Sequence, residues 1–396
     1  MPNSETVLFV SSGPDLSNPA SGEGTRLRNL SRELSSRGWR VLTFVPAETS
    51  GQCPEWVTRQ YSYEQWSLPF LTDLNPSFFY SLRRVLSRES VEVAHLSTGV
   101  CAAKLIGMLG SDLTVVYAAQ NVEADHAKDF VDPDLPAYKR LLGPRLIPLI
   151  EWVTVRCADG ITTVSEKDRD RFVECYGLDG DSVRAVPTGT TAVDRSELDD
   201  PSEVRDRFGL GDGPVVVFHG YYEHPPNREA AKIIDEQIAP QLEERGLDAE
   251  FLLVGRNPPT VSFQNVHAIG FVEDLYSVLN VADVAAVPIL HGGGTKTKLY
   301  DYVSLALPTV ATEKAIEGVD LEPERHVLLS NGVDEEFVSN LAAVLRDEQA
   351  NAEIERNLPR LAEEWDWTRS GEKLEEIYDV LMDRTTESTI LSSGSE

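Results

Sequence analysis

Residues 6–45 read TVLFVSSGPDLSNPASGEGTRLRNLSRELSSRGWRVLTFV, and this stretch decides the fold. It opens on a short apolar run, residues 6–10, that ends in Ser-Ser-Gly-Pro, which is typical of a buried parallel strand meeting its loop. Leucines then recur at helical spacing: Leu27, Leu30 and Leu34. Gly38 ends the predicted helix, and residues 41–45 form a second apolar run. The stretch predicts a β-α-β unit.

The same alternation continues to the end of the chain. Further strands are predicted at residues 91–96, 113–117, 160–164, 183–186, 215–218, 250–254, 266–268, 284–287, 309–311 and 326–329. Helical patterns separate these strands, so the fold class is α/β with doubly wound sheets. Residues 189–213 are polar and acidic and mark a boundary, which predicts domains at 1–195 and 196–367. A last amphipathic helix is predicted near residues 368–384, before a disordered polar tail at 385–396.

The composition excludes several classes of protein. With 36 basic and 65 acidic residues, the net charge of -29 argues against a nucleic-acid partner. Such acidity indicates a halophilic protein, whose carboxylates keep it soluble in a salt-rich cytosol. The four cysteines are widely separated and no histidine stands at zinc-ligand spacing, so no metal site is expected. Without a leader pattern or a run of about 18 apolar residues, the protein should be cytoplasmic or at most peripheral to a membrane.

A glycine-rich segment follows the predicted strand at residues 284–287. Its residues are Gly292, Gly293, Gly294, Thr295, Lys296, Thr297 and Lys298, and a helical pattern comes next. Glycines let backbone N–H groups approach an anion, the helix N-terminus adds partial positive charge, and the lysines add full charges. The segment is interpreted as a phosphate-binding loop, and a flexible turn with two solvated lysines is the alternative.

Four motifs in the second half stand in a specific order: residues 220–230 (GYYEHPPNREA), 251–256 (FLLVGR), 270–275 (GFVEDL) and 282–320. Together they resemble the donor domain of retaining GT-B glycosyltransferases of the glycosyl transferases group 1 family (family 4 type). The first half resembles the acceptor domain at residues 21–26, 120–123, 164–166 and 186–189. The resemblance implies two Rossmann-like domains facing a central cleft, with the C-terminal helix packed back on the first domain.

The resemblance also implies a binding site for a nucleotide sugar, without a metal or a separate cofactor. Residues 292–298 would hold the diphosphate, and Asp301 would accept hydrogen bonds from the ribose. Two further pairs complete the implied site: the backbone of Phe271 and Val272, against which the base lies, and Gly22 and Gly24, which close from the opposite domain.

The chain departs from the family pattern at charged positions of the implied donor site. The first of the family's paired glutamates is Gly293 here, and the usual Arg and Lys of the donor domain fall near Tyr221 and Pro226. Lys296 and Lys298 are therefore expected to supply most of the charge that meets the diphosphate.

A second departure concerns catalysis. Many relatives carry a histidine where this chain has Gln120, and a glutamine hydrogen-bonds a hydroxyl but exchanges no proton near pH 7. Retaining transfer in the family is thought to pass through an oxocarbenium-like species, with the leaving phosphate taking the acceptor's proton, so no side-chain nucleophile is required. Gln120 and Glu123 are the candidate catalytic residues.

Several residues allow two interpretations. Glu123 and Asp125 could form a carboxylate pair for acid–base work, or Glu123 could be a solvated or capping residue. His219 and His224 could line a binding site or serve as structural residues. Residues 317–320 could touch the donor sugar or form a turn.

Residues 139–149 (KRLLGPRLIPL) are basic and apolar within an acidic chain. They could contact a membrane or a lipid-linked acceptor. The alternative is a buried helix start whose arginines extend to the surface.

The expected function is retaining transfer of a sugar from a UDP- or GDP-sugar to a glycan or lipid-linked acceptor, in glycoconjugate or polysaccharide biosynthesis. A nucleotide-sugar epimerase with the GT-B fold is one alternative. A non-catalytic sugar-nucleotide binding subunit is another, because Gln120 and Gly293 replace residues that relatives use.

Overall fold

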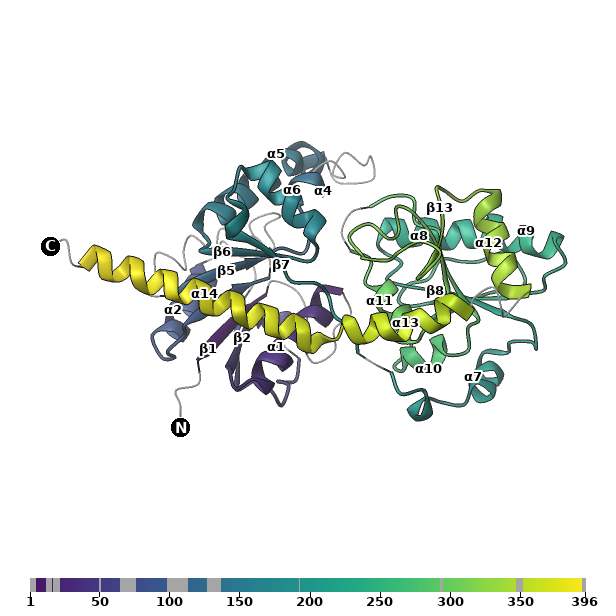
Figure 1. The fold of residues 1–396 in the computed structure, drawn as a ribbon, viewed down its shortest axis with the longest axis horizontal. Helices are drawn as coiled ribbons and strands as arrows, with labels where there is room; N and C mark the ends of the chain where they lie inside the picture. Colours follow the sequence, from purple (N-terminus) through teal and green to yellow (C-terminus); the bar gives the residue numbers. More distant parts are fainter. Residues whose placement is uncertain are drawn as a thin grey trace. The chain divides into compact units, whose positions relative to one another are not determined.

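The computed structural model describes residues 5–11, 16, 22–49, 51–64, 76–97, 113–126, 137–191, 193–292, 295–346 and 352–393. The chain folds into two compact units, one made of Met1–Gly189 and Trp367–Glu396, the other of Thr190–Asp366 (Figure 1). The division falls at 189/190, whereas the acidic stretch places it at 195/196. Thr190 belongs with the second unit because its N–H and hydroxyl donate to Trp365 O and Ala362 O, both at 2.7 Å.

The first unit contains a parallel sheet of seven strands in the order β3-β2-β1-β4-β5-β6-β7. Its strands are β1 (Thr6–Val10), β2 (Arg40–Pro46), β3 (Arg59–Tyr63), β4 (Val93–Leu96), β5 (Thr114–Ala118), β6 (Gly160–Thr163) and β7 (Val183–Ala185). The strand order reverses between β1 and β4, which lie next to each other. In open α/β sheets, ligands bind beyond the carboxyl ends of the strands at such a reversal.

Helices cover both faces of this sheet. The described helices of the unit are α1 (Gly22–Ser36), η1 (Ala47–Thr49), α2 (Pro76–Leu86), α4 (Glu123–His126), α5 (Ala137–Cys157), α6 (Glu166–Tyr176), η3 (Gly180–Ser182) and α14 (Trp367–Ser393). Val7 and Phe9 pack with α1 and α14, whereas Leu8 and Val10 pack with α2. Successive side chains of a strand point to opposite faces, so β1 is apolar throughout because both of its faces are buried.

Helix α14 lies along α1 in the first unit (Figure 1). His95 Nδ1 and Tyr378 Oη are 2.5 Å apart, and burial with the nearby Arg26 charge lowers the pKa of His95 to about 3. The polar composition predicts disorder from residue 385, but α14 continues to Ser393. No glycine or proline interrupts residues 372–393, so a helix anchored by packing near Tyr378 can propagate through them.

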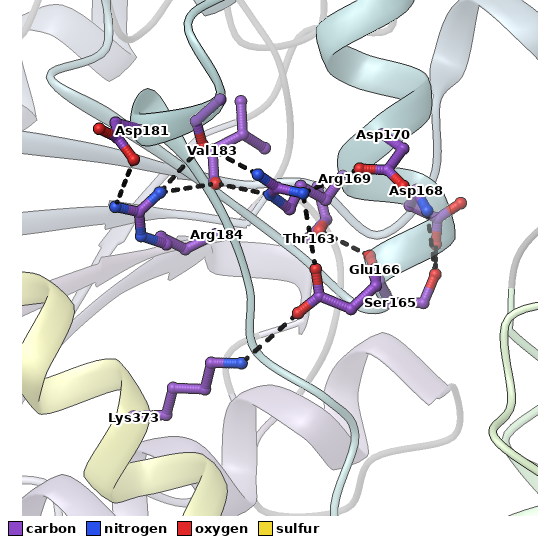
Figure 2. Close-up of polar contacts among 11 residues, drawn as sticks. Thr163, Ser165, Glu166, Asp168, Arg169, Asp170, Asp181, Val183, Arg184 and Lys373 are labelled. Carbon is purple, nitrogen blue, oxygen red and sulfur yellow. Dashed lines mark hydrogen bonds and ion pairs between the residues drawn. The ribbon is translucent and has the colours of Figure 1, made fainter.

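The Val-Ser-Glu stretch of residues 164–166 has a structural role, which Figure 2 shows. Ser165 caps α6, since its Oγ accepts from Asp168 N at 3.1 Å and donates to Asp168 Oδ2 at 2.7 Å. Glu166 lies 3.7 Å from Lys373 Nζ of α14 and 3.9 Å from Arg169 (Figure 2). These ion pairs are exposed, so they add little to the buried contacts that hold α14.

The second unit contains a parallel sheet of six strands in the order β10-β9-β8-β11-β12-β13. Its strands are β8 (Val215–His219), β9 (Glu250–Val254), β10 (Val266–Gly270), β11 (Val284–Val287), β12 (Thr309–Thr312) and β13 (Leu328–Ser330). Its described helices are η4 (Arg195–Glu197), α7 (Pro201–Phe208), α8 (Pro225–Ile233), η5 (Ile234–Ile238), α9 (Ala239–Glu244), α10 (Leu275–Leu279), α11 (Lys298–Ser304), α12 (Glu335–Arg346) and α13 (Ala352–Glu364). The prediction of two doubly wound, Rossmann-like domains is confirmed, and in this unit the order reverses between β8 and β11.

Candidate functional site

Lys298 lies at the strand reversal of the second unit, in the first turn of α11. Its Nζ is 2.7 Å from Asn227 Oδ1 and 3.8 Å from the centre of the Phe218 ring, and only 7% of the residue is exposed. Burial, reinforced by the charge of Lys296, holds the pKa of Lys298 well below its usual value. Burial therefore makes the full charge expected of Lys298 more costly, and an anion that comes close offsets that cost.

Two glycines make room around this lysine. A Cβ on Gly220 would lie 2.9 Å from Asn227 Nδ2 and 3.1 Å from Lys298 Nζ. A Cβ on Gly255 would lie 2.0 Å from Gly220 O, and the φ of +133° at Gly255 also disfavours a side chain. The ends of β8 and β9 therefore approach each other more closely than any larger residue would allow.

Asp301 is held by side chains from two other elements of the second unit, α10 and β8. Tyr276 Oη donates to Asp301 Oδ1 at 2.9 Å, and His219 Nε2 lies 3.1 Å from Asp301 Oδ2. The other nitrogen of His219 is 3.0 Å from Tyr302 Oη. Because the Asp301 side chain is still 27% exposed, its carboxylate can accept further hydrogen bonds. His219 thus orients Asp301, which agrees with the structural interpretation of this histidine.

The glycine-rich loop is described only in part, since Gly293 and Gly294 lie outside the described residues. Gly292 has a φ of +94°, and a Cβ there would lie 2.8 Å from Pro226 Cγ. Thr295 and Lys296 are half-buried, and Thr295 Oγ1 donates weakly to Gly318 O at 3.4 Å. Gly318 therefore supports the loop, and its φ of +78° also fits the predicted turn at residues 317–320.

The residues expected near a base lie after β10. Phe271 is 53% exposed, and the Arg256 guanidinium lies 4.7 Å from the centre of its ring. Val272 is half-buried and packs against the hydrophobic core of the second unit. The sequence pattern predicts a role for the backbone here but not for the exposed aromatic ring with its cation, a pair that can stack on a planar group. His224 is exposed and precedes α8.

In the first unit, the loop after β5 carries Gln120 and Glu123, both half-buried. Glu151 of α5 holds this loop, because its carboxylate accepts from Glu123 N and Ala124 N, each at 3.0 Å. The hydroxyl of Tyr117 also donates to Glu151, at 3.3 Å, and so does the hydroxyl of Tyr176.

Asp125 does not form a catalytic pair with Glu123. Its two carboxylate oxygens accept from Arg171 Nε and Nη2 at 2.8 and 2.7 Å, a bidentate ion pair. Gly22 and Gly24 lie in the first turn of α1, where Gly24 is buried and Gly22 half-buried. Roles for Glu23, which lies between them, and for Glu151 and Tyr276 are not predicted from the sequence, because neither periodicity nor local composition distinguishes these residues.

Two negative findings apply to the described part of the chain. No three His, Cys, Asp or Glu side chains gather there in a way that could hold a metal ion. Among those residues, no helix is long and apolar enough to cross a membrane.

Two family models match the chain. The model described as Glycosyltransferase Family 4 matches residues 20–192, and the model described as Glycosyl transferases group 1 matches residues 213–347. Together with the two parallel sheets, these matches identify the chain as a glycosyltransferase with the GT-B fold.

Solved structures share this fold at low sequence identity. Sucrose-phosphate synthase from Thermosynechococcus elongatus superposes with a TM-score of 0.73 at 15% identity, over 96% of this chain and 100% of that one. Anabaena HepE in complex with UDP-glucose gives 0.69 at 13%, over 95% and 99%. WaaG, a glycosyltransferase involved in lipopolysaccharide biosynthesis, gives 0.69 at 14%, over 94% and 99%. None of the curated proteins compared with the chain matches it.

Proposed function

We propose that the protein is a retaining, metal-independent glycosyltransferase that moves a sugar from a UDP- or GDP-sugar to a glycan or lipid-linked acceptor. The observation that carries this proposal is the group of side chains at the β8–β11 reversal, where buried Lys298 and the oriented carboxylate of Asp301 lie on one short helix. Anabaena HepE, which shares the fold, has been solved with UDP and with UDP-glucose.

In the proposed mechanism, the donor diphosphate binds at Gly292 and Thr295, with Lys296 and Lys298 as its cations. Asp301 accepts hydrogen bonds from the ribose hydroxyls, and the base lies near Phe271 and Val272. As the bond between the sugar and the diphosphate breaks, the lysines and loop amides stabilise the departing charge. The diphosphate takes the proton of the acceptor hydroxyl, so Gln120 and Glu123 need only hold and orient the reacting groups.

A donor screen tests this function. We expect calorimetry with UDP-glucose, GDP-mannose and dTDP-glucose to show binding of a UDP- or GDP-sugar, unchanged by EDTA, and nucleotide release to accelerate when an acceptor is added. Release without transfer, or conversion of the donor sugar without release, would point to the epimerase alternative. Binding without any turnover would point to a non-catalytic subunit, and no binding at all would contradict the proposal.

The outer face of α5 supports a second element of the proposal, contact with the cytoplasmic surface of a membrane. Exposed apolar side chains stand on this helix: Leu141 at 63%, Leu142 at 43%, Leu149 at 55% and Trp152 at 47% exposed. Positions 141, 145, 149, 152 and 156 share one helix face, which adds Arg145 and Arg156 to it. Because these leucines are exposed, a buried helix start does not account for them, and arginines among apolar side chains suit an anionic lipid surface.

Vesicle co-sedimentation tests this contact. The wild-type protein should bind phosphatidylglycerol vesicles more tightly than phosphatidylcholine vesicles. R140Q/R145Q should weaken that binding roughly 30-fold, since each arginine near an anionic surface contributes about 1 kcal/mol. The matched control is R83Q/R84Q, which removes the same charge from the exposed side of α2. Equal losses in both variants, or no binding by the wild type, would remove the membrane contact from the proposal.

A further inference from the structure

Glu23 of α1 has a buried carboxyl oxygen that lacks a partner. Its Oε1 is inaccessible to solvent and makes no hydrogen bond with any described residue, although part of the side chain stays exposed. The carboxyl group also contacts the hydroxyl of Ser97. That hydroxyl also donates to Val10 O at 3.1 Å.

The position of Glu23 is that of a ligand-binding group. It begins the helix that follows β1, and Ser97 follows β4, the strand next to β1. Glu123 follows β5, the next strand in the sheet. The three side chains therefore stand at the carboxyl edge of the first sheet, where its strand order reverses and such sheets bind ligands.

The charge around Glu23 restricts what can bind. Burial raises the pKa of Glu23 to about 7, the contact with Ser97 lowers it, and the negative charge of Glu123 raises it. Near neutral pH the carboxyl group is thus present both with and without its proton, and can donate or accept a hydrogen bond. An anion at this place would meet two carboxyl groups, whereas a hydroxyl group both donates and accepts and carries no charge.

We propose that Glu23 binds a hydroxyl group of the acceptor, and that the acceptor end held here is an uncharged sugar rather than a phosphate. This inference rests on the proposed function, since it assigns the acceptor class of the same enzyme. Buried polar groups in native proteins are nearly always hydrogen-bonded, and the free oxygen of Glu23 gains its partner when the sugar hydroxyl arrives.

Carbon-13 NMR of protein labelled at its glutamate carboxyl carbons tests the inference, with the Glu23 signal assigned by its loss in E23Q. In the free protein the signal should titrate near pH 7. Methyl α-D-glucopyranoside, methyl α-D-mannopyranoside and methyl α-D-galactopyranoside serve as neutral probes, and at least one should displace the midpoint. Glucose 6-phosphate should displace it less. Titration near 4.5, or a midpoint that none of the neutral sugars moves, would overturn the inference.

Two variants separate this role from a purely structural one. E123Q should lower the midpoint of Glu23 because it removes a neighbouring negative charge, whereas E166Q, exposed at the start of α6, should leave it unchanged. Calorimetry with UDP reports on the proposed donor site, whose lysines and Asp301 belong to the second unit. If UDP binds normally but none of the sugars moves the titration midpoint of Glu23, this inference is rejected and the proposed function stands. Absent UDP binding would count against the proposed function itself.

Discussion

Replacing Lys298 with methionine should lower the affinity for the nucleotide-sugar donor at least roughly 100-fold, because a charged hydrogen bond to a buried group is worth about 3 kcal/mol or more once its partner is left unpaired. Methionine keeps much of the side-chain volume beside the Phe218 ring, so the fold should survive. The measurement is calorimetric titration with UDP and with the best donor of the screen. K232M, which removes an exposed lysine of the same unit, is the matched control and should bind as the wild type does.

The same lysine should make donor binding depend on pH. In the free protein, burial and Lys296 hold the pKa of Lys298 well below its usual value. A diphosphate beside the amine favours its charged form and raises that pKa, so binding takes up a proton wherever the free amine is neutral. Affinity should then fall as the pH rises through the window between the two pKa values. In K298M, both this fall and the dependence of the binding enthalpy on the buffer should disappear.

Unchanged affinity in K298M would place the diphosphate elsewhere and remove the main support for the proposed site. A pH-independent affinity in the wild type together with a weak K298M variant would show instead that Lys298 is charged before the donor arrives.

Strand patterns predicted most of the two sheets because buried parallel strands are continuous apolar runs, as in Val7, Leu8 and Phe9. The edge strand β3 is not predicted by such a pattern. Its sequence, RQYSY, is largely polar, and only Tyr63 is buried, so its pairing with β2 depends on the neighbouring strand rather than on its own pattern.

For the candidate site, the sequence predicts which loops carry the binding residues but not which side chains form hydrogen bonds with them. Lys298 and Asp301 were selected by the glycine-rich loop and the family resemblance. Their partners Asn227 and Tyr276 stand 71 and 25 positions away, and no local pattern connects residues at such distances. The pKa shifts of Lys298 and Glu23 depend on burial in the folded protein, and the sequence around each residue does not distinguish it from an ordinary surface charge.

Replacing Glu151 with leucine should destabilise the first unit by about 4 kcal/mol, which is a large share of the stability of a typical domain. Glu151 is only 1% exposed and accepts hydrogen bonds from two backbone N–H groups and two tyrosine hydroxyls. In E151L these four donors lose their acceptor, and each buried donor without one costs about 1–3 kcal/mol before the structure relaxes. Urea unfolding followed by circular dichroism measures the change.

E151L should also loosen the loop that carries the candidate catalytic residue Glu123, since the amides of Glu123 and Ala124 are bonded to Glu151. Hydrogen exchange at these two amides should accelerate beyond what global destabilisation explains. E151Q keeps one acceptor oxygen and nearly the same shape, so it should lose only about 1–2 kcal/mol.

A triple variant decides whether unpaired donors are the cause. In E151L/Y117F/Y176F the two tyrosine hydroxyls are removed together with their acceptor, and replacing both partners of a buried hydrogen bond by apolar groups is far less costly than removing one. The triple variant should therefore be more stable than E151L, even though it carries three substitutions instead of one. If it is less stable, the lost free energy comes from repacking around α5 and not from the hydrogen bonds, and Glu151 would be a packing residue whose polar contacts are secondary.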